Sequence, residues 1–259
     1  MKYTAVEIRV SDNGVALLCM NNPEKRNALT RAMRGDLKNA LGELAARPDA
    51  RVVVITGHDS VFCAGLDLAE LSSLSVPAQA AAFTEEIEAL FNDLLFHPLP
   101  TIAAVSGPAY AGGFDLAALC DIRVASDTAT FCQAELRLAV SPISSPLWMN
   151  VGLSRAKELA FTADPITAAE ALRIGLVNHV FPPGKYLDGA LELAGTIARH
   201  DPAVLKSVKA QINLLAALPL QQAIRLQFLA IRAGFGSEAT STAAARILEN
   251  LGSKPRSGR

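Results

Sequence analysis

The sequence predicts an α/β protein with a mainly parallel sheet, followed by a C-terminal α-helical region. In the first half of the chain, short apolar runs alternate with segments whose apolar residues recur at helical spacing. After residue 150 the helical pattern predominates, and it continues from residue 201 to about residue 251. We therefore expect an α/β core at 1–200, with right-handed crossovers between parallel strands, and a helical region at 201–259.

The strand candidates are apolar runs of the kind that a parallel sheet buries on both faces. After an alternating first segment, MKYTAVEIRV, they are VALLCM (15–20), RVVVITG (51–57), TIAAVSG (101–107) and DIRVAS (121–126). Helices are expected between them. Thr30 is placed to cap a helix whose apolar residues recur every three or four positions. A second helix is expected at about residues 79–96.

Capping signals organise the second half of the chain. Ser154 is expected to cap the helix SRAKELAFTA, and Thr167 with Glu170 has the spacing of a capping box. LVNHVF (176–181) is a short strand candidate. Asp201 precedes a proline, an arrangement typical of a helix N-cap followed by Pro at the first helical position.

Composition excludes several classes of protein. The 259 residues are 51% hydrophobic with a formal net charge of −1, which argues against a polybasic surface for nucleic acid or anionic membrane. The N-terminus lacks the apolar core of a signal peptide, and no apolar run approaches the roughly 18 residues of a spanning helix. The four cysteines have no metal-binding spacing. We expect a cytoplasmic protein with no disulfide, metal or membrane partner.

Two glycine-containing loops each lead from a buried strand into a helix: CAGLDL (63–68) and GGFD (112–115). The first N–H groups of a helix have no intrahelical partner. If the loops are neighbours in space, one N–H from each could bind a single oxygen, which is an oxyanion hole worth roughly 2.7–4 kcal/mol per donor. Spacing alone favours ordinary strand-to-helix turns.

Two acidic residues are candidates for catalysis: one belongs to the second loop, and the other lies 20 residues further along the chain. Asp115 is in the first turn of a helix, where the dipole favours a carboxylate. Glu135 is flanked by apolar residues, so it lies either on a solvent-exposed side or in a pocket. Two carboxyl groups that share a cavity can hold a water and divide acid and base roles. The dinucleotide fingerprint, the P-loop and the GxSxG elbow are absent, and His97 is interpreted as a loop residue.

Five segments together resemble the crotonase superfamily, the enoyl-CoA hydratase/isomerase family. They are NPEKRNALT, VVVITGHDSVFCAGLDL, PTIAAVSGPAYAGGFDLAALCDIRVAS, ATFCQAELRL and TAAEALRIGLVNHV, and the resemblance spans roughly residues 5–250. It implies a spiral of ββα turns with a C-terminal helical trimerisation region. It also implies an acyl-CoA thioester as ligand, with coenzyme A as part of the substrate and no separate cofactor, and a trimer or a dimer of trimers.

The resemblance also assigns roles to individual residues. The backbone N–H groups of Ala64 and Gly112 match the positions that bind the thioester oxygen, Asp115 matches the acid that activates water, and Glu135 matches the acid that exchanges a proton at the α-carbon. The residues implied in substrate binding are Lys25, Arg26, Ala28, Ala64, Gly65, Leu66, Asp67, Leu68, Gly112 and Pro142.

This chain departs from the family pattern at two places. Hydratases of the family have Glu where this chain has Asp115, so the carboxylate is one methylene shorter. VSPISSPLWMN (140–150) replaces a glycine-rich turn and is similar to the form in branched or terpenoid-type glutaconyl-CoA hydratases. We expect an enoyl-CoA hydratase. The alternatives are a Δ3,Δ2-enoyl-CoA isomerase that uses Glu135 alone, and a catalytically degenerate scaffold that binds acyl-CoA or RNA.

Overall fold

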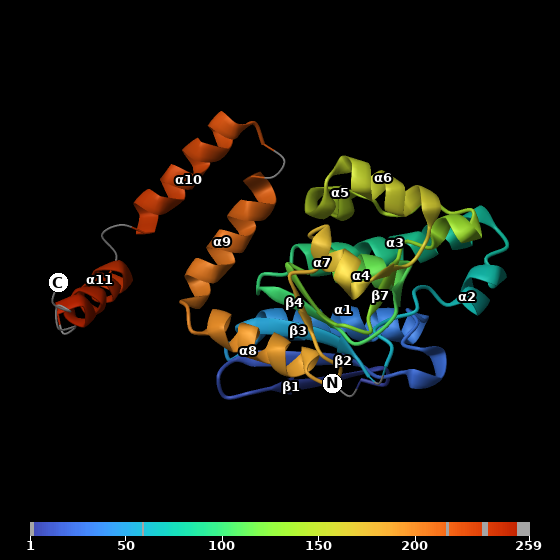
Figure 1. Ribbon diagram of the computed structural model, residues 1–259, viewed down its shortest axis with the longest axis horizontal. Helices are drawn as coiled ribbons and strands as arrows, with labels where there is room; N and C mark the ends of the chain where they lie inside the picture. Colours follow the sequence, from blue (N-terminus) through green and yellow to red (C-terminus); the bar gives the residue numbers. More distant parts are fainter. Residues whose placement is uncertain (1–2, 59, 216–217, 235–237, 253–259) are drawn as a thin grey trace. The chain divides into compact units, whose positions relative to one another are not determined.

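The computed structural model describes residues 3–58, 60–215, 218–234 and 238–252 (Figure 1). The chain divides into two compact units, Met1–Lys209 and Ala210–Arg259. This division lies further along the chain than the predicted boundary at residue 200, because the first part of helix α9 (Pro202–Leu215) belongs to the first unit. There the Lys209 ammonium pairs with Asp121 at 2.8 Å and donates to the carbonyl oxygen of Leu99 at 3.0 Å.

The first unit is built on a six-stranded sheet with the strand order β1-β2-β3-β4-β6-β9. Strand β1 is antiparallel to β2, and the other pairs in this sheet are parallel, which confirms the predicted mainly parallel sheet. The strands are β1 (Val6–Val10), β2 (Val15–Met20), β3 (Val52–Gly57), β4 (Thr101–Val105), β6 (Ile122–Ser126) and β9 (His179–Phe181).

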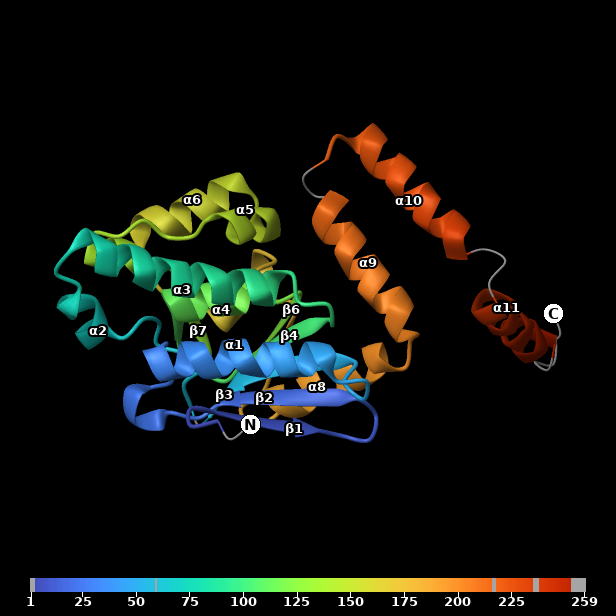
Figure 2. The same ribbon diagram turned by 180° about the vertical axis from the view of Figure 1, so that it is seen from behind.

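Helices cover both faces of this sheet. The helices α1 (Arg31–Ala46), α3 (Pro77–Leu95) and α4 (Gly112–Leu119) belong to the core on one face, and α8 (Tyr186–Ala198) packs on the other. Helix α8 lies in front of the sheet in Figure 1, and α1 lies in front of it in Figure 2. Because side chains alternate along a strand, Val53 and Ile55 enter the first core, and Val52 and Val54 enter the second. This explains why β3 is apolar throughout.

A second, three-stranded sheet adjoins the loops of interest. It contains β5 (Ala109–Tyr110), β7 (Thr130–Cys132) and β8 (Ile166–Thr167). The remaining elements of this unit are the helices α2 (Leu68–Ser73), α5 (Ser145–Val151), α6 (Leu153–Thr162) and α7 (Ala168–Arg173), and the 3₁₀ turns η1 (Pro23–Lys25) and η2 (Glu135–Leu138).

Most of the predicted caps are present. The side chains of Thr30 and Thr167 accept hydrogen bonds from the N–H groups of Met33 and Glu170. Asp201 accepts from the N–H groups of Ala203 and Val204, at 2.9 and 3.0 Å. The prediction for Ser154 is wrong, because α6 begins one residue earlier, after Gly152. The positive φ of Gly152, 80°, lets the chain turn directly from α5 into α6.

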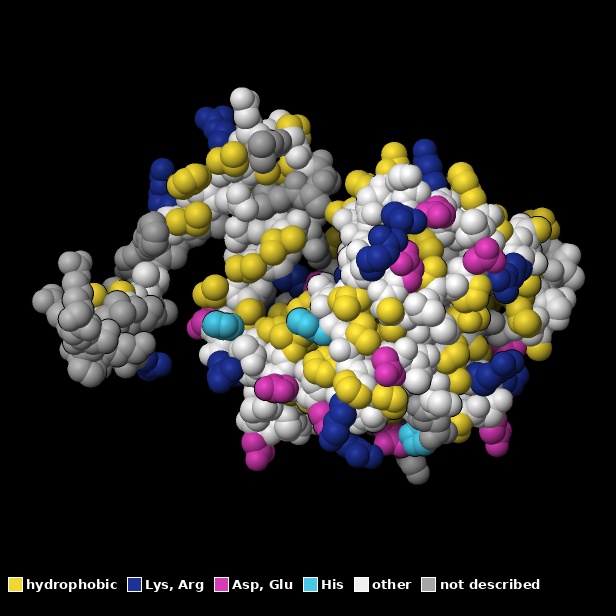
Figure 3. All heavy atoms as spheres, viewed as in Figure 1, with side chains coloured by type: hydrophobic (Ala, Val, Ile, Leu, Met, Phe, Trp, Pro, Cys, Tyr) yellow, Lys and Arg dark blue, Asp and Glu magenta, His cyan; other side chains and the backbone are white. Residues whose placement is uncertain are grey.

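The second unit contains the helices α10 (Leu220–Gly234) and α11 (Glu238–Gly252). Several of its large apolar side chains are exposed, including Phe228 and Leu229. Figure 3 shows hydrophobic side chains along α10. Among the described residues, no helix is both long enough and apolar enough to cross a membrane.

Candidate active site

Both predicted acids line one apolar cavity of about 350 Å³. Its walls come from the loops that follow β3 and β5, from α2 and α3, and from η2 with the segment behind it. The lining residues are Ala64, Leu66, Leu68, Leu71, Thr84, Ile87, Phe91, Tyr110, Ala111, Gly112, Asp115, Ala134, Glu135, Arg137, Leu138, Val140, Ser141 and Ile143. Asp115 and Glu135 supply the only carboxyl groups among these residues.

The two glycine loops meet at this cavity, as the oxyanion-hole hypothesis requires. A Cβ built on Gly65 would lie 2.7 Å from the carbonyl oxygen of Tyr110 and 3.3 Å from the amide nitrogen of Gly112. A Cβ on Gly113 would lie 2.2 Å from the carbonyl oxygen of Cys63. Glycine is therefore needed at both positions so that the backbones can approach each other. The turns are closely packed against one another.

Not every predicted backbone donor is available to a ligand. The N–H of Ala64 donates to the carbonyl oxygen of Arg26 at 3.1 Å, which is at odds with its predicted role. The N–H groups of Leu66 and Gly112 have no acceptor among the described residues. Both residues line the cavity, and the Leu66 side chain lies 3.6 Å from a Cβ built on Gly112. Sequence patterns do not indicate this, because the acceptor for Ala64, the carbonyl oxygen of Arg26, lies in a distant loop.

The residue that precedes helix α4 has a strained backbone. Ala111 has φ 48° and ψ −124°, a region that glycine adopts far more readily than alanine. Its own N–H is held by the carbonyl oxygen of Cys132 at 2.8 Å. This conformation turns the chain so that Gly112 starts the helix at the cavity wall.

Burial of two acids together makes the cavity unusual. Asp115 is 5% exposed and Glu135 is 8% exposed. Burial, and secondly the charge of Glu135, raise the pKa of Asp115 well above its ordinary range. Burial also raises the pKa of Glu135. Apart from its interaction with the side chain of Asp115, Glu135 has no hydrogen-bond partner for either carboxylate oxygen among the described residues.

Gln133 belongs to this site and was missed by the sequence analysis. Its amide nitrogen donates to the carbonyl oxygen of Ile143 at 2.9 Å, and its side chain is buried. A side-chain hydrogen bond from Gln133 to Asp115 acts against the rise in the pKa of that acid. Gln133 therefore links Asp115 to the segment that closes the cavity. The signal in the sequence is a polar amide residue within an otherwise apolar run, two positions before Glu135.

A second cavity of about 300 Å³ adjoins the first and shares Ala64, Leu66 and Leu68 with it. The remaining lining residues are Glu24, Lys25, Arg26, Ala28, Asp67 and Ala69. The ammonium of Lys25 pairs with Asp67 at 2.9 Å, which lowers the pKa of Asp67. Most of the predicted substrate-binding residues thus lie together.

Two of the predicted substrate-binding residues do not line either of these cavities. Gly65 lies behind the wall, where it allows the close approach to Gly112. Pro142 is flanked by Ser141 and Ile143, which line the apolar cavity while Pro142 itself does not. Both residues therefore lie next to lining residues, and their roles in substrate binding stay predictions.

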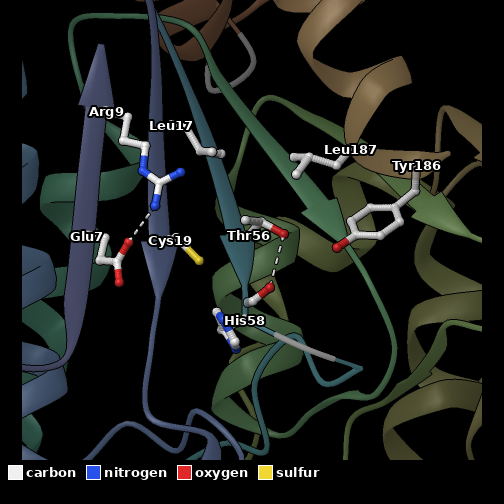
Figure 4. A pocket seen from close by; sticks show the side chains of 9 residues that line it. Glu7, Arg9, Leu17, Cys19, Thr56, His58, Tyr186 and Leu187 are labelled. Carbon is white, nitrogen blue, oxygen red and sulfur yellow. Dashed lines mark hydrogen bonds and ion pairs between the residues drawn. The ribbon is translucent and has the colours of Figure 1, made fainter. Parts of the chain in front are cut away.

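A further cavity, of about 340 Å³, lies on the sheet face covered by α8 (Figure 4). It is lined by Glu7, Arg9, Leu17, Cys19, Thr56, Gly57, His58, Tyr186 and Leu187. Among these residues there is one carboxylate, and it is paired with Arg9 at 3.1 Å. This cavity does not offer the paired acids of the apolar cavity.

His97 lies in the loop between α3 and β4, which confirms the prediction that it is a loop residue. It is buried, and its ring nitrogens lie 3.1 Å and 3.3 Å from the carbonyl oxygens of Leu41 and Leu99. Burial lowers its pKa. In the described part of the chain, no group of three His, Cys, Asp or Glu residues is placed to hold a metal ion.

Comparison with known proteins places this site in a family. A sequence model described as enoyl-CoA hydratase/isomerase matches residues 11–246. The chain belongs to the enoyl-CoA hydratase/isomerase family. It is 36% identical over 227 residues to a putative enoyl-CoA hydratase of Thermus thermophilus, covering 86% of this chain and 90% of that protein. It is 37% identical over 210 residues to the 2,3-dehydroadipyl-CoA hydratase of Escherichia coli, covering 80% and 81%.

Solved structures agree with this assignment. The crystal structure of an enoyl-CoA hydratase from Bacillus anthracis superposes with a TM-score of 0.91 at 27% identity, covering 95% of this chain and 97% of that one. The fold is therefore the crotonase fold that the resemblance implied. Enzymes of this family act on acyl-CoA thioesters.

Proposed function

We propose that this protein is an enoyl-CoA hydratase, which adds water across the double bond of a 2-enoyl-CoA thioester. The observation that carries the proposal is the pair of buried acids, Asp115 and Glu135, in one apolar cavity beside the N–H of Gly112. An apolar cavity suits an acyl chain, and the adjoining polar cavity with Lys25 suits the coenzyme A portion.

The thioester oxygen would accept hydrogen bonds from two backbone donors. Addition of water to the β-carbon moves negative charge to this oxygen, and fixed N–H groups stabilise the resulting enolate. Gly112 is the first donor, because it begins α4 at the positive end of the helix dipole. We propose Leu66 as the second donor in place of Ala64, whose N–H is already bound to Arg26.

The acid pair would supply the proton transfers. Burial raises the pKa of both acids, and the charge of Glu135 raises that of Asp115 further, which favours a pair with one proton over a doubly ionised pair. Hydration would start from the form of the pair in which Glu135 carries this proton. Asp115 would take a proton from water as its oxygen bonds to the β-carbon, and Glu135 would give a proton to the α-carbon as the enolate collapses. The product is a 3-hydroxyacyl-CoA. One proton is gained and one is lost by the pair, so an exchange between the two acids restores the starting state.

A specific observation supports isomerisation as a second candidate. Apart from the interaction with Asp115, both carboxylate oxygens of Glu135 lack hydrogen-bond partners among the described residues, so this acid can face a ligand by itself. In a Δ3,Δ2-enoyl-CoA isomerase Glu135 would remove a proton from one carbon and return it to another, and Asp115 would have no part in the reaction.

Substitution of Asp115 separates these candidates. Asp115→Asn should lower the rate of crotonyl-CoA hydration by about 10²–10⁴-fold, the usual contribution of an acid–base group. Asp188→Asn, on the exposed surface of α8, is the matched control and should retain the wild-type rate. Hydration by Asp115 and Glu135 is refuted if Asp115→Asn hydrates crotonyl-CoA at the wild-type rate. It is also refuted if the wild type and Asp115→Asn both convert a 3-enoyl-CoA and neither hydrates a 2-enoyl-CoA.

We also propose that the protein assembles as a trimer or a dimer of trimers in the cytoplasm. The exposed apolar side chains of the second unit, among them Ile224, Phe228 and Leu229, favour burial in an assembly. None of the four cysteines is in a disulfide, and disulfides are rare in the reducing cytoplasm. Sedimentation as a monomer at micromolar concentration would contradict the assembly.

A further inference from the structure

Arg34 is a buried cation that joins three separate segments of the first unit. It extends from α1 and is 3% exposed. Its guanidinium donates to the carbonyl oxygen of Leu29 at 2.8 Å, to both carboxylate oxygens of Glu70 at 2.8 and 3.3 Å, and to Glu86 at 2.7 Å. It also lies 4.6 Å from the centre of the Phe83 ring.

The network has a substantial electrostatic component. Burial opposes the charge of Arg34, but the hydrogen bonds to Glu70 and Glu86 outweigh this effect and raise its pKa. The bond to Arg34 also lowers the pKa of Glu86. A planar guanidinium can bind one carboxylate with two parallel bonds and still reach a second, which lysine cannot do. The geometry therefore depends on arginine at this position.

Each partner of Arg34 belongs to a segment that forms a wall of the apolar cavity. Leu29 pairs through its backbone with Leu66, which lines the cavity. Glu70 lies on α2, whose Leu68 and Leu71 line the cavity. Glu86 lies on α3, whose lining residues are Thr84, Ile87 and Phe91.

Helix α2 is the segment that depends most on this contact. None of its residues is fully buried, and within the helix Leu71 packs, partly buried, against the core. It is joined to α3 by a short linker, and its N-terminus is capped by Asp67. The ion pair from Arg34 to Glu70 adds a polar contact between α2 and α1, and the bond from Arg34 to Glu86 extends this contact to α3.

We propose that Arg34 is a positioning residue that sets the width of the acyl cavity and thereby the acyl-chain length that the protein accepts. This inference rests on the proposed function for the identity of the ligand. Arg34 does not touch the ligand. It holds α2 and α3 together, so that their apolar side chains close the cavity around a short or medium acyl group.

The test uses a mild substitution at the exposed end of the network together with a matched control. Glu86→Gln keeps the size of the side chain but removes its charge, and Glu85→Gln makes the same change at the neighbouring exposed position of α3. Arg34→Met removes the whole network, and Arg34→Lys keeps the charge without the bidentate geometry.

Two measurements on the full-length protein are compared. Calorimetry with butyryl-CoA and decanoyl-CoA gives the ratio of affinities for a long and a short saturated chain, and hydrogen exchange reports on residues 68–76. In Arg34→Met and Glu86→Gln, the affinity ratio should shift toward decanoyl-CoA by about fivefold or more, because residues of such networks change binding affinity at a distance by this factor. Hydrogen exchange in α2 should also be faster in these variants. Arg34→Lys should lie between Arg34→Met and the wild type.

The outcomes are distinguishable from a failure of the proposed function. If the wild type binds both thioesters but hydrates no enoyl-CoA, the reaction is wrong and the affinity ratios still test Arg34. If Glu86→Gln folds and exchanges faster but keeps the wild-type ratio, or if Glu85→Gln shifts the ratio equally, Arg34 does not set acyl-chain length. If Arg34→Met does not fold, Glu86→Gln and Arg34→Lys decide alone.

Discussion

Gly113 lies so close to Cys63 that a Cβ built on the glycine would be 2.2 Å from the cysteine carbonyl oxygen. These two residues belong to loops about 50 residues apart in the sequence, and their contact brings the backbones of both loops to one cavity.

Gly113→Ala should therefore destabilise the protein by about 1–3 kcal/mol, the usual cost of overpacking a rigid core. Gly42→Ala, in the exposed part of α1 with no atom within 4 Å of the new Cβ, should instead stabilise it by up to about 1 kcal/mol. Urea unfolding measures both. Equal midpoints for the two variants would contradict the close contact.

Ala111→Gly should raise the stability of the protein by about 1 kcal/mol. Glycine adopts the φ of 48° and ψ of −124° without the strain that alanine bears there. The matched control is Ala32→Gly, on the exposed surface of α1, which should lower stability by about 1 kcal/mol. Thermal unfolding compares them, and a lower melting temperature for Ala111→Gly would show that the strain is absent.

Asp115→Asn and Glu135→Gln should both make the protein more stable at pH 8 while they lower activity. Because the pKa of each acid is raised on folding, the folded protein binds more protons than the unfolded chain above the ordinary pKa of about 4. The stability that these acids contribute is present below that pH and is lost as the pH rises through the raised values.

The difference in melting temperature between each variant and the wild type should therefore be largest at pH 8 and should shrink toward pH 4. Asp188→Asn, at an exposed position, serves as the control and should show no such trend. A wild type that gains stability over its variants as the pH rises would reverse the predicted sign.

Lys25→Gln should raise KM for an enoyl-CoA by about three- to tenfold with little change in kcat. The ammonium lies at the polar cavity, half exposed, where it would attract the phosphates of coenzyme A without contact with the reacting atoms. The difference in KM between Lys25→Gln and the wild type should become smaller as the salt concentration rises, because salt screens the attraction between Lys25 and the phosphates. Lys157→Gln, on the exposed side of α6, is the control, and an unchanged KM for Lys25→Gln would exclude this role.

Local patterns in the sequence predicted much of the fold. The apolar run at 52–57 is buried on both faces of the sheet, and Thr30, Thr167 and Asp201 cap the helices that they precede. These features depend on neighbouring residues, because strand alternation and N-capping involve only a few consecutive positions. The family resemblance supplied Asp115 and Glu135 as candidates from their motifs.

The sequence by itself determined the strands, the helix caps and the candidate acids, and the tertiary structure decided which groups lie together at the cavity. The acceptor of the Ala64 N–H, the partners of Arg34 and the effect of Glu135 on the pKa of Asp115 all join residues distant in the chain. Hydrogen bonds and electrostatic interactions depend on which groups fold to within a few ångströms of one another and are shielded from water. That proximity exists only once the sheet, the loops and the helices have packed together.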